Sequence, residues 1–398
     1  MKLLLTVSAW LALIMLPLST MAQTSAEGTD LVPPDPIDIA PPIFPASALG
    51  DEAWVQLNFT VKADGSTADF AATDDFGRDT FKDAAMAAAR GWKFRPGQAN
   101  GKPTDWQNYT YDVFFAYPNA VAGGYPGFAT LQDTVSKLLL DKKFADAKAA
   151  IEAAQANHSV RLLFEYASLE TLLYTAESGL GNSLAAYRAI ARATPDVRIN
   201  RRPQGPDIGT RLKTKVQLAP TAILPDMVLK SALRTRFAAE AKLGLYGDAL
   251  ATYERIDALE KITPADPLVG QRRLINDAIA SDQPLGVSAR IEDGSWLNRP
   301  VRRKFGFAQV KGSIDKIKLA CNRHGAELPY KDGSQWEMPA EWGDCTIEVV
   351  GADGTQFVFV QTGAAIAARA VRQAPTVVLA PDKPYETPIQ VAPNRPGN

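Results

Sequence analysis

The side chains best suited to chemistry in this sequence are two cysteines, Cys321 and Cys345, and two histidines, His158 and His324. Cys321-x-x-His324 with Cys345 supplies three ligands of the kinds that zinc takes, but a closed zinc site needs four, and no fourth is evident. The two cysteines lie 24 residues apart, each at the end of a segment typical of a β-strand. In an oxidising compartment this pattern predicts a disulfide, which would contribute about 3 kcal/mol.

Signatures of catalysis are weak. The sequence contains no G-x-S-x-G, P-loop, H-E-x-x-H or G-x-G-x-x-G motif, and two histidines are few for acid–base chemistry. Adjacent carboxylates such as Asp74-Asp75 indicate little without a cleft around them. We therefore expect a non-enzymatic protein with no catalytic residue, no metal and no cofactor, and a hydrolase is the less favoured alternative.

The composition indicates a folded protein of several domains. The chain has 398 residues, 46% of them hydrophobic, and 43 basic against 44 acidic residues give a net charge of −1. This length predicts two or three domains, and the charge balance argues against a nucleic-acid partner. One local excess of positive charge could meet an acidic partner or an anionic polymer, or could simply be solvated. It consists of Arg198, Arg201, Arg202, Arg211, Lys213 and Lys215.

The N-terminal segment has the pattern of an export signal. Lys2 precedes an apolar run from Leu3 to Leu18, and Thr20-Met21-Ala22 places small residues at a cleavage site. The run is shorter than the twenty or so residues that span a bilayer. We expect residues 1–22 to be a signal peptide cleaved near Ala22, which would export the protein to a compartment where disulfides persist. The alternative is an uncleaved membrane anchor, the only case in which membrane contact is expected.

Proline content and periodicity divide the remaining chain. Six prolines lie between residues 33 and 45, at the end of a predicted linker at 23–39 and just after it. Six more lie in the last 24 residues. The regions between them change from strand to helix to strand periodicity. We expect a multidomain α+β protein with domains at 40–118, 125–283 and 285–372, and a disordered proline-rich tail at 373–398.

The first domain is predicted to contain two strands, a helix and a third strand, in that order. Apolar and polar residues alternate over 55–61, Asp64-Gly65 predicts a hairpin turn, and a second strand follows at 67–73. An alanine-rich stretch at 81–92 has helical spacing. A last strand rich in aromatic residues covers 106–117.

This domain resembles the C-terminal domain of TonB, through five motifs that occur in the right order over about 75 residues. Each motif is weak alone, and their order makes the match specific. The motifs are Pro42-x-Phe44-Pro45-x-x-Ala48, Val55-x-Leu57-x-Phe59-x-Val61 followed by Asp64-Gly65, Phe81-x-x-Ala84-Ala85, Trp92-Lys93-Phe94-Arg95-Pro96 and Gly101-x-Pro103.

The resemblance implies recognition by strand addition. In this family an extended peptide from a TonB-dependent outer-membrane receptor pairs with the edge of the last strand, so main-chain hydrogen bonds supply the affinity. Here the implied partner-binding residues are consecutive, although their apolar members could simply fill the core, and other parts of the chain could cover the edge. They are Asn108, Tyr109, Thr110, Tyr111, Asp112 and Val113.

Two departures set this chain apart from the energy transducers of the family. More than 250 residues follow the domain, whereas in the transducers it ends the chain. The apolar N-terminal segment has no histidine, whereas the transducers retain a membrane helix with a functional one. The resemblance implies a Gram-negative envelope, so we expect a periplasmic protein that binds other envelope proteins. An energy transducer anchored in the inner membrane is the runner-up.

The second and third domains add helices and then strands. Helical periodicity covers six stretches between 130 and 280, and small residues recur at 147, 183 and 249 as in tetratricopeptide repeats. This predicts a tetratricopeptide-like solenoid with a concave binding surface, with a helical bundle as the alternative. Short β-rich segments separated by Asp-Gly and Lys-Gly turns then predict a small β-sandwich that carries the disulfide. Its strands are expected at 285–291, 303–310, 314–320, 346–350 and 355–361.

Overall fold

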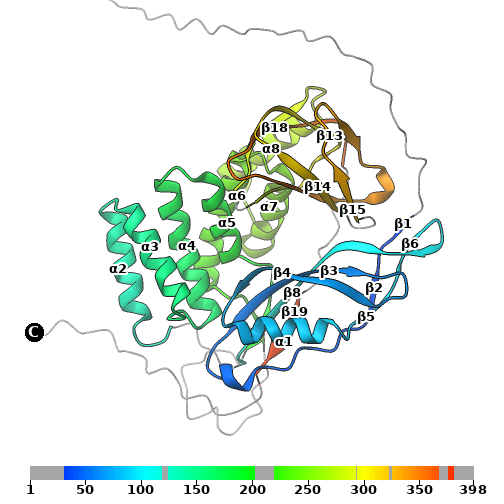
Figure 1. Cartoon of the computed structure of the whole chain (residues 1–398). Coiled ribbons are helices and arrows are strands. Elements are labelled where there is room, and N and C mark those ends of the chain that lie inside the picture. Colours follow the sequence, from blue (N-terminus) through cyan, green and yellow to red (C-terminus); the bar gives the residue numbers. More distant parts are fainter. Residues whose placement is uncertain are drawn as a thin grey trace, which may run out of the picture.

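The structure is a computed structural model, and it describes residues 31–118, 124–201, 219–292, 294–321, 325–366 and 375–380. Three hydrophobic cores organise these residues: one in an N-terminal sheet with its helix, one in a row of helices, and one in a C-terminal pair of sheets (Figure 1). The expected signal segment lies outside the described residues. Among the residues described, no helix has both the length and the apolar character that a membrane crossing requires.

The N-terminal sheet has the order that the sequence predicts, strand, strand, helix, strand. Alternate residues of β3 (Ala53–Val61) are buried, β4 (Thr67–Phe76) pairs with it antiparallel, and α1 (Asp79–Ala89) covers the inner face. The hairpin turn needs glycine at Gly65, where φ is 80° and a Cβ would lie 2.1 Å from the Phe94 carbonyl oxygen. β8 (Trp106–Ala116) then pairs with the other side of β3.

The predicted proline-rich linker is in part a component of this domain. β1 (Leu31–Val32) pairs with β6 (Gly97–Ala99), which also pairs with β7 (Lys102–Thr104). β2 (Asp35–Asp38) pairs with β5 (Lys93–Arg95). Proline is compatible with such edge strands because it need not donate to the ladder, so residues 31–32 and 35–38 are corrected from linker to strand.

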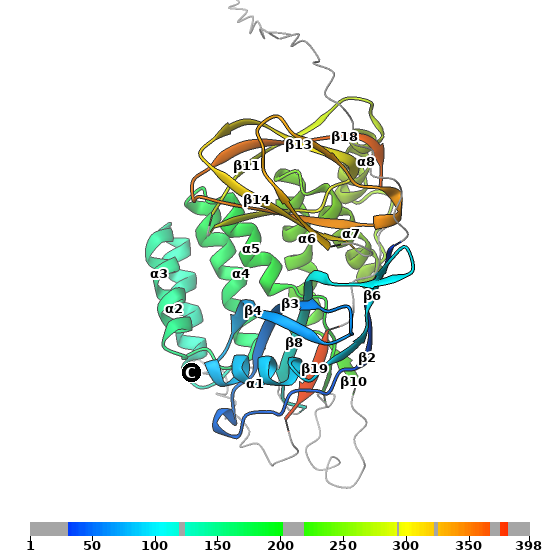
Figure 2. The same ribbon diagram turned by 45° about the vertical axis from the view of Figure 1, so that its right-hand side comes forward.

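The middle of the chain is helical, and consecutive helices lie side by side (Figures 1 and 2). The first of the six predicted helical stretches, 130–155, is two helices in the structure, because the chain turns at 141–143, where Lys142 has a φ of 58°. Ala147 and Ala249, two of the recurring small residues, are fully buried. The helices are α2 (Phe128–Leu140), α3 (Phe144–Ala156), α4 (Leu163–Gly179), α5 (Ser183–Ala193), α6 (Asp226–Lys242), α7 (Tyr246–Glu260) and α8 (Pro267–Ala280).

The C-terminal region consists of two four-stranded antiparallel sheets that share one core. One has the order β11-β18-β13-β16, and the other β12-β17-β14-β15. Three short strands, β12, β15 and β16, are additions to the five that the sequence predicts. The strands are β11 (Leu285–Arg290), β12 (Ser295–Asn298), β13 (Arg302–Lys311), β14 (Ile314–Cys321), β15 (Gly325–Pro329), β16 (Gln335–Glu337), β17 (Cys345–Gly351) and β18 (Gln356–Ala365).

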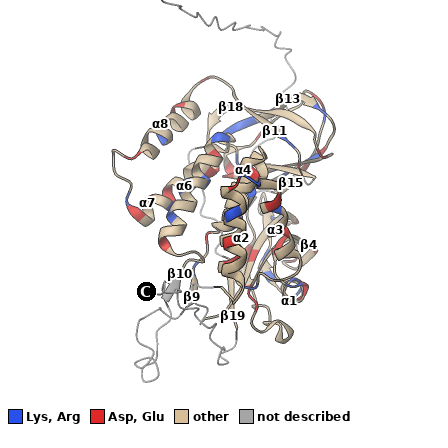
Figure 3. Cartoon of the chain, turned by 90° about the vertical axis from the view of Figure 1, so that its left-hand side faces the viewer, with Lys and Arg blue, Asp and Glu red and all other residues tan. Residues whose placement is uncertain are grey.

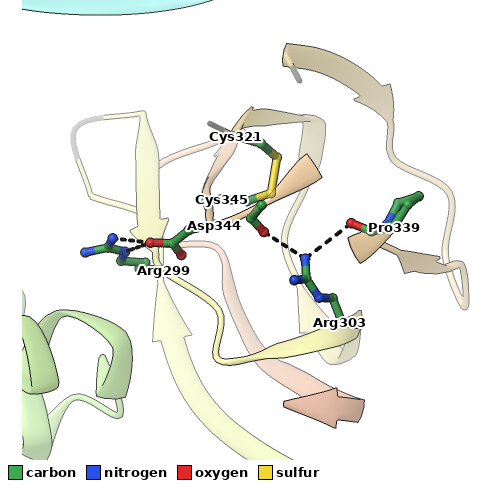
Figure 4. The surroundings of a disulfide bond; sticks show 7 residues. Arg299, Arg303, Cys321, Pro339, Asp344 and Cys345 are labelled. Carbon is green, nitrogen blue, oxygen red and sulfur yellow. Dashed lines mark hydrogen bonds and ion pairs between the residues drawn. A yellow bond between two sulfur atoms is a disulfide. The ribbon is translucent and has the colours of Figure 1, made fainter. Parts of the chain in front are cut away.

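A disulfide joins two neighbouring strands of the second sheet. Cys321 ends β14, Cys345 begins β17, and the two are direct cross-strand partners joined by a 2.02 Å S–S bond (Figure 4). Beside them Arg303 donates to the carbonyl oxygens of Pro339, at 3.2 Å, and Gly343, at 2.7 Å. The bond therefore closes the loop that contains β15 and β16.

A buried arginine fastens the helices to this region. Arg302, only 2% exposed, donates to the carbonyl oxygens of Gln283 at 2.7 Å, Ala278 at 3.0 Å, and Ser281. Ala278 belongs to the last turn of α8, where helix carbonyls lack partners within the helix and the dipole favours a cation.

We expect loss of the disulfide to destabilise the C-terminal region. Replacing both cysteines by serine (Cys321→Ser with Cys345→Ser) should lower its free energy of unfolding by about 3 kcal/mol, because the 24-residue loop then opens in the unfolded chain. Urea denaturation followed by near-UV circular dichroism measures this. Reductant should shift the wild-type midpoint and leave the double variant unchanged; an equal shift in both would contradict the expectation.

Candidate functional site: the outer edge of β8

β8 (Trp106–Ala116) lies inside the sheet and presents a different surface on each face. Tyr111, Val113 and Phe115 face the core under α1, and Val113 and Phe115 are fully buried. Phe81 of α1 packs on Phe115 with ring centroids 5.0 Å apart. The apolar side chains of the predicted partner-binding strand therefore belong to the core, and a partner would have to use the backbone.

The opposite face of the sheet packs on the helices. Phe114 of β8 belongs to the helical core, with Trp54 packed beside it. Phe76 of β4 stacks on Tyr166 of α4 at 4.3 Å between ring centroids. Because both faces are covered, an edge is the remaining place where the sheet can meet another strand.

The outer edge of β8 carries a strand from the C-terminal end of the described chain. β19 (Thr376–Leu379) pairs with β8 in parallel, from Thr376 opposite Val113 to Leu379 opposite Ala116, and the sheet order is β19-β8-β3-β4 (Figure 2). The Ala380 amide donates to the Ala116 carbonyl at 2.9 Å. Residues 376–379, which the proline content assigned to a disordered tail, are thus a strand.

Successive residues of a β-strand point their backbone N–H and C=O groups to opposite sides. The residues of β8 whose backbone groups face its outer edge can therefore be identified. Since the Ala116 carbonyl points to β19, the backbone groups of Phe114, Asp112 and Thr110 face the same edge, and the residues between them face β3. β19 covers the Val113–Ala116 part of this edge. Thr110 lies beyond it, with an exposed side chain.

The side chains of β19 are held on both faces of the sheet. Val378 is 7% exposed and Ala380 is 5% exposed, both in the core under α1, whereas Val377 and Leu379 pack against the helical core. Thr376 shares a 2.7 Å hydrogen bond between its hydroxyl and that of Tyr111. β19 is therefore matched to this edge by its side chains as well as by its backbone.

A second element approaches the other end of the edge. β15 (Gly325–Pro329) contacts the start of β8, and a Cβ at Gly325 would lie 2.6 Å from the Gln107 carbonyl oxygen. The C-terminal region therefore bounds the edge at Gln107, which limits a strand added in trans to the stretch between there and Ala116.

The other residues predicted for partner binding have varied positions. Tyr109 is half-buried against Phe59, at 5.3 Å between ring centroids, and Asp112 accepts a 3.1 Å hydrogen bond from Gln56. Asn108 lies on β8, but its side chain is outside the described set. Sequence reasoning missed β19, although its Thr-Val-Val-Leu run is β-prone; the prolines at 375 and 381 dominated the interpretation.

A buried carboxylate joins this sheet to the helices. Glu52, 1% exposed, accepts from the Tyr117 amide at 2.9 Å and from the Leu163 amide of α4 at 3.0 Å. Next to it Asp51 forms ion pairs with Arg78, at 2.5 Å, and with Arg161. The carboxylates thus fix the end of β8 against the start of α4.

Glu165 completes this joint from the helical side. Its carboxylate accepts from the amides of Tyr125 at 2.5 Å, Arg161 at 2.7 Å and Leu162 at 3.1 Å. Burial raises the pKa of Glu165, and these backbone donors oppose the rise. Tyr125 also donates its hydroxyl to the Gly50 carbonyl at 2.5 Å.

A second group of charges lies where β4 meets α4 and α5. Arg192 donates to Glu170 at 3.1 Å and lies 4.0 Å from Asp74. Burial raises the pKa of both carboxyl groups, and Arg192 opposes the rise. The pKa of the buried Tyr166 beside them is raised well above its usual value for the same reason, burial. These groups are packed between elements and their partners are protein side chains.

The remaining predicted sites are only partly described. Arg198 is exposed, Arg201 lies on β9 (Ile199–Arg201), which pairs with β10 (Ala219–Thr221), and the other basic-loop residues fall outside the described residues. Over the helices, basic and acidic side chains are intermixed (Figure 3). Within the described ranges, no group of three or more metal-binding side chains comes together.

One cavity of about 430 Å³ lies between the start of α5, the α6–α7 turn and the sheet of β11 and β18. Trp296 and Phe357 contribute apolar surface to it, and Arg290 and Lys311 add positive charge. Among its described lining residues, Glu292 is the single carboxylate. This is not the acidic cleft that paired-carboxylate hydrolysis requires.

Comparison with known families identifies the N-terminal domain. Residues 41–115 match the family described as "Gram-negative bacterial TonB protein C-terminal". No curated protein matches the chain. Residues 41–115 therefore form a TonB C-terminal domain, and the predicted resemblance is confirmed with the domain near the N-terminus.

A solved structure also matches part of the chain. It is the solution NMR structure of the Pseudomonas aeruginosa TonB C-terminal domain, with 25% sequence identity and a TM-score of 0.20. The match covers 24% of this chain and 95% of that one. TonB-family proteins belong to the Gram-negative envelope, and their C-terminal domains interact with envelope or outer-membrane receptor proteins.

We expect the buried joint to be essential for stability. Glu52→Ala leaves the buried amides of Tyr117 and Leu163 without an acceptor, and should lower the free energy of unfolding by about 3 kcal/mol. Urea denaturation measures the change. The matched control is Glu152→Ala, an exposed α3 carboxylate that should cost less than about 0.5 kcal/mol. Equal costs for the two variants would contradict this assignment.

The buried carboxyl of Glu170 predicts a definite pH dependence. Its folded-state pKa lies above its ordinary value of 4.5, so the folded state binds the proton more tightly than the unfolded state does. The free energy of unfolding should therefore fall as pH rises from about 4.5 through the raised pKa. Glu170→Gln removes this titration, and its stability should vary less over that window. Denaturation midpoints between pH 4.5 and 8 test this; an unchanged slope would refute it.

Proposed function

We propose that this protein is a periplasmic protein-interaction factor whose TonB C-terminal domain binds extended segments of envelope proteins, TonB-dependent outer-membrane receptors among them, along the outer edge of β8. The observation that carries the proposal is β19, a strand already paired in parallel with Val113–Ala116. An edge that accepts one strand offers main-chain groups to another of compatible side chains.

The helices supply a second surface for the same role. We take α2–α8 to be a tetratricopeptide-like array, because Phe144 and Tyr246 begin α3 and α7, and the small residues three positions on, Ala147 and Ala249, are fully buried. Arrays of paired helices present extended concave surfaces to peptides. The C-terminal region would be a β-sandwich fastened to this array through Arg302.

The location in the periplasm rests on the sequence of residues 1–22 and on the disulfide. A Cys321–Cys345 bond persists in oxidising compartments, of which the periplasm is one. Cleavage near Ala22 would leave the protein free of the inner membrane, and therefore outside the energy-transducing role of anchored family members. The N-terminal residue of the native protein, determined by mass spectrometry, distinguishes the two forms.

Strand addition at β8 predicts that one backbone amide decides partner binding. Thr110→Pro removes an edge-facing N–H and places a ring on the edge, while the ladder to β3 keeps its donors. The matched control, Thr110→Val, keeps the N–H. After crosslinking in intact envelopes, receptors should be recovered with Thr110→Val and about tenfold less with Thr110→Pro, the loss expected from one main-chain hydrogen bond. Equal recovery, or no receptor with the wild-type chain, would overturn the proposed function.

A further inference from the structure

We propose that β19 closes the outer edge of β8 from within the chain, and that a partner segment pairs along the whole edge only after β19 has left. This rests on the proposed function, since it concerns the same edge. The juxtaposition that carries it is the parallel pairing of Thr376–Leu379 with Val113–Ala116.

Occupation by β19 and by a partner is mutually exclusive. Each backbone group on the edge can join one ladder, and the Ala116 carbonyl already accepts the Ala380 amide at 2.9 Å. A second strand would lie at the same spacing from β8, about 4.8 Å, and so in the volume that β19 fills. A partner that reaches beyond Asp112 toward Ala116 must therefore displace β19.

β19 is also the strand of this sheet that can leave at the least cost. Within the described chain it pairs with β8 alone, and the pairing of β8 with β3 and of β3 with β4 does not depend on it. It is four residues long, and Val378 is its single buried side chain. β3, in contrast, has nine residues and contributes five apolar side chains that are at most 1% exposed.

The side chains of β19 define the chemistry of the segment that can replace it. The residue at the Thr376 position meets the Tyr111 hydroxyl, which favours serine or threonine. The residue at the Val378 position enters the core under α1, where a charge would be buried without a partner. The residues at the Val377 and Leu379 positions pack toward the helices, where aliphatic side chains fit. The segment that fits is thus a hydroxyl residue followed by three aliphatic residues, running parallel to β8.

Hydrogen exchange on the unmodified full chain is the first test. If β19 leaves while the rest of the sheet stays folded, the amides of Val378 and Ala380, which face β8, should exchange at least about tenfold faster than those of Val55, Leu57 and Phe59 in β3. The amide of Phe114 on β8 should share the faster rate. Equal protection of β19 and β3 would show that β19 is a permanent strand and would overturn the proposal.

Peptide binding to shortened chains is the second test. The probe is a fluorescein-labelled peptide with the sequence of residues 375–382 of this chain, and the binder is a chain that ends at Ala374. The matched control ends at Ala380 and keeps β19. We expect the chain ending at Ala374 to bind the probe at least about tenfold more tightly than either the control or the full chain. A probe with aspartate at the Val378 position should not bind.

A full-length variant covers the case in which the shortened chain does not fold. Val378→Asp places a charge in the core under α1 and should release β19 within an otherwise complete chain, which then binds the probe. If the chain ending at Ala374 and the Val378→Asp variant both fold and the probe binds neither of them, the proposal is overturned.

The outcomes also separate this proposal from the proposed function. Equal receptor crosslinking to the full chain and to the Val378→Asp variant, still sensitive to Thr110→Pro, would refute closure by β19 and leave strand addition standing. Crosslinking that is insensitive to Thr110→Pro in both would refute strand addition itself. The expected result is crosslinking that is sensitive to Thr110→Pro and stronger when Val378→Asp has released β19.

Discussion

The arrangement of the N-terminal sheet on the helices depends on a carboxylate that is almost fully shielded from water. Glu52 stands at the start of β3 and accepts amides from the end of β8 and the start of α4, so one side chain holds two regions in register. A buried charge of this kind is costly unless its lone pairs are satisfied, and breaking it leaves the donors unpaired. Asp51 and Glu165, each with several partners, extend the same joint. The outer edge of β8 is therefore presented by a sheet that is fixed against the helices.

Much of the fold follows from local sequence. The alternation at Val55–Val61, the helical spacing after Phe81 and the order of the TonB-like motifs are short-range patterns, and the structure has the corresponding elements. The last strand of the domain, predicted at 106–117, is present as β8 (Trp106–Ala116). The directions of its side chains also follow from the period of a strand, which is why Tyr111 and Val113 turn inward.

The occupant of the edge could not be predicted in the same way. β19 is four residues long and lies among prolines, and its pairing joins residues that are far apart in the sequence. The short strands β1 and β2 were missed for a related reason, because proline is common both in linkers and in edge strands. The role of Glu52 could not be predicted either, because it depends on a hydrogen bond from the amide of Leu163, more than a hundred positions away. Each of these is a long-range contact, and a single sequence records the residues without their distance in space.

The return of the chain to its first sheet has a consequence for the order of folding. The hydroxyls that meet at Tyr111 and Thr376 belong to residues 265 positions apart. Closing so long a loop costs entropy before the contact offers any gain, so contacts of this kind form late. A chain that folds from its N-terminus as it emerges therefore completes β3, β4 and β8 while β19 is still unmade. In that interval the molecule carries a bare strand edge, the feature through which folding chains join one another and aggregate. The newly made protein, more than the finished one, is the form that needs protection from its neighbours.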